Sequence, residues 1–179
     1  FGAILKVNTT STPYGIYIDY ANATPNNGGS SFIYCEDSTI VRFIVTSNGN
    51  ALNSNGSYGQ YSDIKLKENI TDATPKLNDL LKVNIKNFNF IGNDTKQIGV
   101  IAQELEKIFP SMIDNVADVE DQEVTDKDGN MTTEKVDLGT TTKSVKYSVF
   151  TPMLIKAIQE QQTIIDTLTA RLDVLENKA

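Results

Sequence analysis

The organisation of the chain follows from one stretch, Ser62-Asp63-Ile64-Lys65-Leu66-Lys67-Glu68-Asn69-Ile70. Residues 1–61 hold only five charged residues, but nine of the fourteen Phe and Tyr residues and seven of the eleven glycines. Residues 62–179 carry the other 34 of the 39 charged residues. This change in composition predicts two domains, 1–61 and 62–179.

The same stretch places a serine near two lysines. A serine hydroxyl becomes a nucleophile when a base takes its proton, and a serine–lysine pair is one known form of this arrangement. Lys67, five residues after Ser62, and Lys65 are the candidate bases. A free lysine has a pKa of about 10.4, so it needs burial or another cation to act as a base near neutrality. We therefore expect such a site to be silent in the unfolded chain; the alternative is a solvated loop.

Composition narrows the function classes. The net charge is -7, the pI is near 4.6 and no basic cluster occurs, which argues against nucleic acid as a partner. The chain has no His and one cysteine, Cys35, so metal sites built on His or Cys and disulfides within one chain are excluded. We expect no metal, no cofactor, no membrane span and a cytosolic folding compartment.

Residues 1–61 read as a β segment. Alternating runs at 15–20 and 40–45 are separated by the hairpin-turn signals Asn27-Gly28, Asn48-Gly49 and Asn55-Gly56. Short strands without helices bury little surface alone, so we expect other copies of the chain to cover them. Phe1 begins in mid-pattern, which suggests the end of a longer protein. Receptor binding, if any, is expected in the missing part or in this segment, whose tyrosines either fill the core of the segment or contact a glycan.

Residues 62–110 predict short elements of both kinds. A helix is expected from Thr74 as N-cap, with Pro75 at the first helical position. Residues 83–90 alternate as a strand with a possible bulge at Asn87. Residues 97–101 form a second strand that runs into a helix, which Pro110 ends.

Residues 114–143 predict a long acidic hairpin with its turn at 126–130. The acids of this turn only faintly match a calcium loop, and a plain β-turn is the better interpretation. Residues 143–147 are then expected to return as a strand.

The last element, 149–177, has the spacing of a coiled-coil helix. Its seam residues follow one another at steps of 4, 3, 4, 3, 4 and 3: Leu154, Ile158, Gln161, Ile165, Leu168, Leu172 and Leu175. With residues 154, 161, 168 and 175 taken as a positions and residues 158, 165 and 172 as d positions, the seam favours three or more helices. The alternative is an amphipathic helix that packs on its own domain.

Three sets of motifs resemble the C-terminal intramolecular chaperone of phage endosialidases, tailspikes and tail fibres. They are Ser62-Asp63 with Lys65-Leu66-Lys67-Glu68-Asn69-Ile70; Ile98-Gly99-Val100-Ile101-Ala102-Gln103-Glu104-Leu105 with Phe109-Pro110; and Val145-Lys146-Tyr147, Pro152, Leu154-Ile155, Ala157-Ile158 and Glu160-Gln161-Gln162. Together they extend over 62–179, and 1–61 lie outside the resemblance. The fold class implied is α+β: a β-rich trimeric fibre segment, then a mixed module with a long coiled-coil helix.

The resemblance also implies an activity. The module would trimerise, assemble its own N-terminal fibre segment, and be released by a cut between Tyr61 and Ser62. Ser62 would attack the Tyr61 carbonyl, Lys67 would be its base and Asp63 would orient the site. Assembly would take place in the host bacterial cytoplasm, and the fibre part would end on the virion tail. An uncleaved trimerisation cap is the first alternative; a similar module in a membrane-bound transcription regulator is the second, but the flanking β segment does not suit it.

Overall fold

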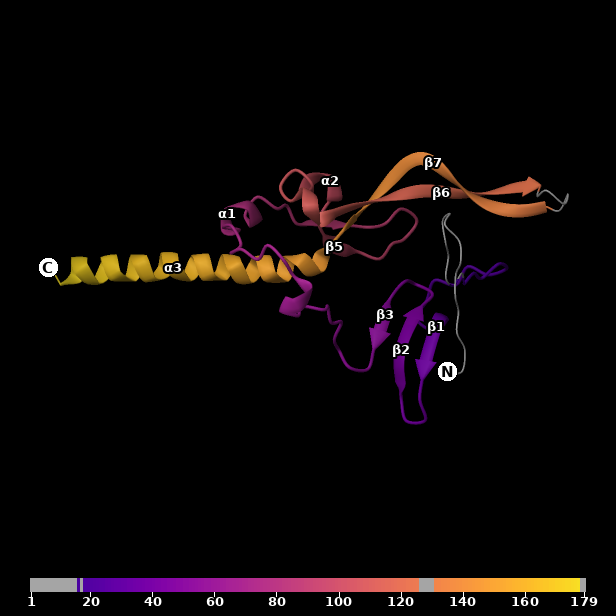
Figure 1. Ribbon diagram of the computed structural model, residues 1–179, viewed down its shortest axis with the longest axis horizontal. Helices are drawn as coiled ribbons and strands as arrows, with labels where there is room; N and C mark the ends of the chain where they lie inside the picture. Colours follow the sequence, from indigo (N-terminus) through magenta and orange to yellow (C-terminus); the bar gives the residue numbers. More distant parts are fainter. Residues whose placement is uncertain (1–15, 17, 126–130, 178–179) are drawn as a thin grey trace. The chain divides into compact units, whose positions relative to one another are not determined.

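The computed structural model describes residue 16, residues 18–125 and residues 131–177 (Figure 1). The chain divides into two compact units, Phe1–Asn69 and Ile70–Ala179. Strands and helices both occur, and the chain ends in a long helix, which confirms the predicted α+β class.

The first unit contains a three-stranded antiparallel sheet of β1 (Ser31–Glu36), β2 (Val41–Thr46) and β3 (Ala51–Asn53), in that order. The predicted run at 40–45 corresponds to β2. The predicted turn at Asn48-Gly49 joins β2 to β3, and Gly49 has the positive φ of 85° that such a turn favours.

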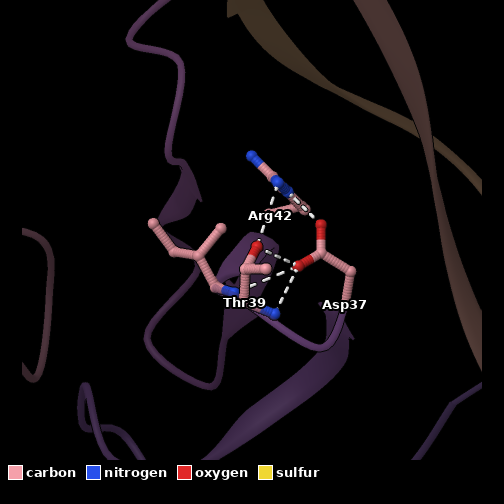
Figure 2. Close-up of polar contacts among 4 residues, drawn as sticks. Asp37, Thr39 and Arg42 are labelled. Carbon is pink, nitrogen blue, oxygen red and sulfur yellow. Dashed lines mark hydrogen bonds and ion pairs between the residues drawn. The ribbon is translucent and has the colours of Figure 1, made fainter.

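The turn between β1 and β2 is closed by Asp37 (Figure 2). One carboxylate oxygen accepts hydrogen bonds from the Thr39 hydroxyl and from the Thr39 and Ile40 amides, at 2.8 and 3.1 Å for the amides. The other oxygen pairs with Arg42 Nε at 2.5 Å. These contacts, above all the Thr39 hydroxyl, hold the pKa of Asp37 well below its ordinary value. Asp37 therefore has a local structural role in the hairpin.

The strand predicted at 15–20 is not found in its described part. Residues 15 and 17 lie outside the described residues, and residues 16 and 18–20 are not in a strand. Tyr20 instead donates a hydrogen bond from its hydroxyl to the Ser31 carbonyl at 2.5 Å, and its ring packs against Phe32 in a tilted arrangement with ring centroids 4.8 Å apart. A side-chain anchor on β1 thus replaces the expected strand pairing.

The second unit is organised around a small apolar cluster. Its elements are α1 (Leu77–Leu80), β4 (Lys86–Phe88), β5 (Gln97–Gly99), α2 (Ala102–Leu105), η2 (Pro110–Met112), β6 (Ile113–Thr125), β7 (Met131–Val145), η3 (Tyr147–Val149) and α3 (Phe150–Glu176). The buried residues of the cluster are Val100, Leu105, Phe109, Met112, Ile113 and Met153. They come from the loop after β5, from α2, from η2 and the residue before it, from β6 and from α3. The cluster therefore packs residues 100–113 against the long helix α3.

Two predicted strands are shorter than the alternation suggested. The strand expected at 83–90 is only β4, and its pairing with β5 has no bulge at Asn87. Ile85 and Phe90, two apolar residues of that alternation, are each 61% exposed. The strand expected at 97–101 ends at Gly99, because the Val100 amide donates to the Tyr147 hydroxyl at 3.2 Å instead of to a strand partner.

The predicted acidic hairpin is present as β6 and β7, which form a long twisted two-stranded ribbon (Figure 1). Its predicted turn at 126–130 lies outside the described residues. Residues 143–145 are the last part of β7, and Tyr147 begins η3, so the strand expected at 143–147 is present but ends at Val145. Where the register shifts between Ala117 and Val119, Asp118 accepts hydrogen bonds from the Thr140 and Thr142 hydroxyls at 2.7 and 2.6 Å. A side-chain contact thus stabilises the irregular point of the ribbon.

The C-terminal helix α3 runs for 27 residues as one continuous helix (Figure 1). Within the described residues, no helix is both long enough and apolar enough to cross a bilayer. Met153 and Ala157 are its buried residues, and α3 packs against α1 and η3. Only the first part of α3 therefore contributes to the core of the second unit.

Candidate functional site

Ser62 and Lys67 are brought together by one tight turn. Residues Ile64–Leu66 form the short 3-10 helix η1, and the Lys67 amide donates to the Ile64 carbonyl at 3.1 Å. The turn reverses the chain, so that Lys67 Nζ donates a hydrogen bond to Ser62 Oγ at 2.6 Å. Asn69 follows in the left-handed conformation, with φ 52°, which asparagine tolerates better than most residues. The predicted nucleophile and its predicted base are thus in direct contact.

Asp63 acts on the turn and not on that pair. Its carboxylate accepts the Lys65 amide at 3.0 Å and lies 3.4 Å from Lys65 Nζ. Asp63 is therefore the N-cap of η1. Among the described contacts, none joins Asp63 to Ser62 or to Lys67, so any orienting role is exerted through the turn.

The pair lies open to solvent in the single chain. Ser62 and Lys67 are exposed, and Tyr61, whose carbonyl is the predicted target, is 93% exposed. A lysine ammonium that donates to a hydroxyl must lose a proton before it can act as a base, and burial is one of the causes that promote this loss. In the described chain, Ser62 and Lys67 are therefore in contact, but neither is buried.

The predicted seam of α3 is also exposed. Its apolar members, with exposed fractions between 51% and 66%, are Leu154, Ile158, Ile165, Leu168, Leu172 and Leu175. The helix contacts its own unit through a different stripe, which includes Met153, Ala157 and Glu160. The contacts of α3 with its own unit therefore leave the heptad stripe uncovered.

The heptad letters assigned from the sequence were wrong. The step from a to d is three residues and the step from d to a is four. Because Ile158 follows Leu154 by four residues, Leu154 is a d position and Ile158 is an a position. Ile at a with Leu at d is the pattern that favours two strands. The seam residues alone therefore do not select three helices, and the trimer expectation rests on the family resemblance.

Sequence reasoning missed the contact between α3 and the start of α1. Both carboxylate oxygens of Glu160 accept backbone amides, Oε1 from Lys76 at 2.8 Å and Oε2 from Leu77 at 3.0 Å. The helix therefore begins at Leu77 with Lys76 as its N-cap residue, and the predicted start at Thr74 was wrong. The two amides, Leu77 first, lower the pKa of Glu160. The sequence alone shows Glu160 only as part of a motif and assigns it no role.

Two of the quoted motifs meet at Tyr147. Its hydroxyl accepts the Val100 amide, and a Cβ added to Gly99 would lie only 2.5 Å from the Tyr147 hydroxyl oxygen. A larger residue at position 99 would have to displace the Tyr147 side chain. The contact fixes the end of β5 against η3.

No metal centre competes with this site in the part of the chain that the structure describes. Over residue 16, residues 18–125 and residues 131–177, no group of three or more His, Cys, Asp or Glu side chains is arranged to hold an ion.

Comparisons with known proteins bear on the stretch that begins at Ser62. Residues 62–114 match the model of the family described as the chaperone of endosialidase. No curated protein matches the sequence. Among solved structures, the carboxy-terminal domain of the bacteriophage T5 L-shaped tail fibre with its intramolecular chaperone domain aligns with a TM-score of 0.43 and 13% identity. The alignment covers 76% of this chain and 43% of the fibre chain. The resemblance predicted from the motifs is confirmed for residues 62–114, which match the chaperone-of-endosialidase family model.

Proposed function

We propose that residues 62–179 form an intramolecular chaperone that assembles a phage tail fibre or tailspike and is released by a cut between Tyr61 and Ser62. The observation that carries the proposal is the 2.6 Å hydrogen bond between Lys67 Nζ and Ser62 Oγ. It involves the first residue of the segment that matches the chaperone family. The contact joins a candidate nucleophile to a candidate base next to the proposed bond.

The proposed cut proceeds in two steps. Ser62 Oγ attacks the Tyr61 carbonyl carbon while its proton passes to the neutral amine of Lys67. The C–N bond between Tyr61 and Ser62 breaks, the Ser62 nitrogen takes a proton, and Tyr61 is left as an ester on Ser62 Oγ. Water then hydrolyses the ester, which gives a free carboxylate on Tyr61 and restores the Ser62 hydroxyl. One chain turns over once, and no cofactor takes part.

Assembly is the proposed trigger. Ser62 and Lys67 are exposed in the single chain, so the single chain does not provide the burial that would favour a neutral lysine. Covering the exposed apolar stripe of α3 favours association of the chains, because it removes leucine and isoleucine side chains from water. If association also covers Lys67, the cut follows assembly and makes it difficult to reverse.

The proposed partner is two further copies of the same chain, with residues 1–61 as the folding client. A helical bundle has mostly local contacts and forms sooner than long-range strand pairing. It would then hold three β segments at high effective concentration. We place this assembly in the host bacterial cytoplasm and the released fibre part on the virion tail.

A second candidate function is a permanent trimerisation cap that is never cut. The exposure of Ser62 and Lys67 favours it, since the described chain by itself contains no buried base next to the serine. The two candidates differ in chain length after folding, not in oligomeric state.

A denaturing gel with intact-mass measurement separates them. Residues 62–179 are 118 of 179 residues of a 19.7 kDa chain, so the released piece is expected at about 13 kDa. Ser62→Ala and Lys67→Ala are expected to stay whole. Lys65→Ala, which removes a lysine paired with Asp63, is the matched control and is expected to be cut. Cutting of Ser62→Ala, or a wild-type trimer that stays whole, would contradict the proteolytic part.

A further inference from the structure

The apolar part of the α3 seam does not by itself choose how copies of the helix align. Six of the seven seam residues are leucine or isoleucine, and all six are exposed in the single chain. The hydrophobic effect that would cover them has no direction. A neighbouring helix shifted by one heptad, or turned end for end, would cover much the same side chains. Any choice between these alignments must therefore come from polar residues on the seam or beside it.

Gln161 is the one polar residue of the seam. It is exposed, and within the described residues its side chain has no hydrogen-bond partner. A glutamine amide carries both donors and an acceptor, so a second glutamine at the same level can satisfy it. A leucine from a shifted helix would instead leave the amide buried without a partner, which costs free energy. Gln161 therefore favours a neighbour whose own Gln161 lies at the same level.

Two opposite charges flank the last part of the seam. With Leu168 and Leu175 as d positions, Arg171 is a g position and Glu176 is an e position. The other e and g positions between residues 154 and 176 are uncharged: Ile155, Ala157, Gln162, Ile164 and Thr169. In a parallel, in-register coiled coil, a g residue faces the e residue of the next heptad on the neighbouring helix. Glu176 is that residue for Arg171, five positions later in the sequence.

The single chain leaves both charges without an ionic partner. In the part of the chain that the structure describes, neither the Arg171 nor the Glu176 side chain takes part in an ion pair or a hydrogen bond. Residues three or four apart lie on one face of a helix, whereas residues five apart do not, so the two cannot pair within one α3. The positions three and four residues from Arg171 on its own helix hold no acid. The charges are therefore complementary to a second copy of the same helix.

We infer that an ion pair between Arg171 of one chain and Glu176 of the next, together with a layer of Gln161 side chains, selects a parallel, in-register alignment of α3. The inference rests on the proposed function and deepens its assembly step. The partner is a second copy of this chain, because the glutamine and the charge pair each complement themselves. This alignment places the start of α3, with the packed residues Met153 and Ala157, at the same end of the bundle in every copy.

Sedimentation equilibrium on Ser62→Ala chains tests the ion pair by exchanging its charges. Arg171→Glu places like charges opposite each other in the inferred alignment, so we expect roughly tenfold weaker association at low salt and a smaller effect at high salt. The double variant Arg171→Glu with Glu176→Arg has the wild-type net charge and is expected to recover the wild-type association constant. A double variant as weak as Arg171→Glu alone would overturn the ion pair.

Disulfide formation tests the alignment itself, in Ser62→Ala, Cys35→Ser chains that carry Leu175→Cys, oxidised in a glutathione buffer. A disulfide needs Cα atoms within about 7 Å, so residues 175 of two chains can be linked only when the helices are parallel and in register. We expect linked chains as the main product and a lower yield when Gln161→Leu is added. That variant should still associate, because leucine extends the apolar stripe.

Gln159→Leu is the matched control, because Gln159 is an exposed glutamine of the same turn that lies off the seam. Its yield of linked chains is expected to equal that of the parent, and equal yields for both leucine variants would overturn the role of Gln161. If the parent associates but position 175 is not linked, the helices align in another way, so the inference fails and the proposed assembly stands. Chains that stay monomeric in every variant would contradict the proposed assembly and the inference together. None of these readouts depends on cleavage.

Discussion

Replacing Leu172 by glutamine tests whether the exposed stripe of α3 is the surface on which chains associate. Burying a leucine side chain completely is worth about 1.5–3 kcal/mol. Leu172 is 54% exposed in the single chain, so covering what remains gives about half of that, roughly 0.8–1.6 kcal/mol per chain. Across three chains the loss would be about 2.4–5 kcal/mol, or a roughly 50- to 3,000-fold weaker association.

Val174→Gln is the matched control. Val174 is 53% exposed and lies two residues along the same helix, but outside the seam. Neither side chain is in the buried cluster, and glutamine is a good helix former, so neither change should unfold α3. A difference between the two variants therefore reports the seam alone.

The assay is sedimentation equilibrium over a range of protein concentrations, carried out on Ser62→Ala chains so that cleavage does not change the species. The chain with the wild-type seam and Val174→Gln should associate with similar constants. The association constant of Leu172→Gln should be weaker by the factor above, which moves the midpoint concentration of a monomer–trimer equilibrium by about the square root of that factor. Equal shifts for both variants, or a chain that stays monomeric in every form, would refute the assignment of the stripe as a seam. The same data give the number of chains, which the seam residues alone do not select.

Two further predictions concern the second unit. Gly99→Ala should lower the free energy of unfolding by about 1–3 kcal/mol in urea titrations, because the new methyl group displaces the Tyr147 hydroxyl, whereas Gly59→Ala, with open space around it, should be neutral. The pKa of Glu160 is lowered below its ordinary 4.5 by the hydrogen bonds that it accepts from the Leu77 and Lys76 amides. These bonds therefore stabilise the fold above that pH, and their contribution is lost as the pH falls through the lowered pKa. Melting temperatures between pH 7 and pH 3 should therefore fall less steeply in Glu160→Gln than in wild type; parallel curves would contradict this.

The elements that the sequence predicted best are those whose signal is local and repeated. The seam spacing from Leu154 to Leu175 extends over six steps and predicted the long helix α3. The hairpin of β6 and β7 followed from a long acidic segment around a turn-rich stretch. In α3 many residues carry the same period, so errors at single positions do not change the interpretation.

The elements that were misjudged are set by contacts between distant residues. Thr74 and Pro75 form an adequate helix start in isolation, but the amides two residues later find the Glu160 carboxylate, and the helix begins there. The end of β5 is likewise fixed by Tyr147, 47 residues after Val100. No local propensity contains this information, because the partner is chosen by the tertiary fold.

In the candidate site, too, the features set by local sequence could be predicted and those set by distant contacts could not. Ser62 and Lys67 could be named from the motif, and one turn of η1 suffices to bring them together. Glu160 could not be assigned a role from sequence, since its effect depends on the packing of α1 against α3. The heptad letters were wrong for a simpler reason: the order of the steps of three and four between Leu154 and Leu175 was reversed.

The exposure of the candidate site and of the seam has one physical consequence for the proposed mechanism. A lysine in water keeps its proton and is a poor base, and an apolar helical stripe in water gains free energy when it is covered. An event that covers both would supply the driving force for association and the desolvation that the chemistry needs. A single chain would then be stable against its own peptidase activity for as long as it is alone. The timing would follow from burial alone, so a seam variant such as Leu172→Gln should delay the cut at concentrations where it delays association. Cutting at the wild-type rate by a chain that remains monomeric would show that the lysine is activated within one chain and that assembly is not the trigger.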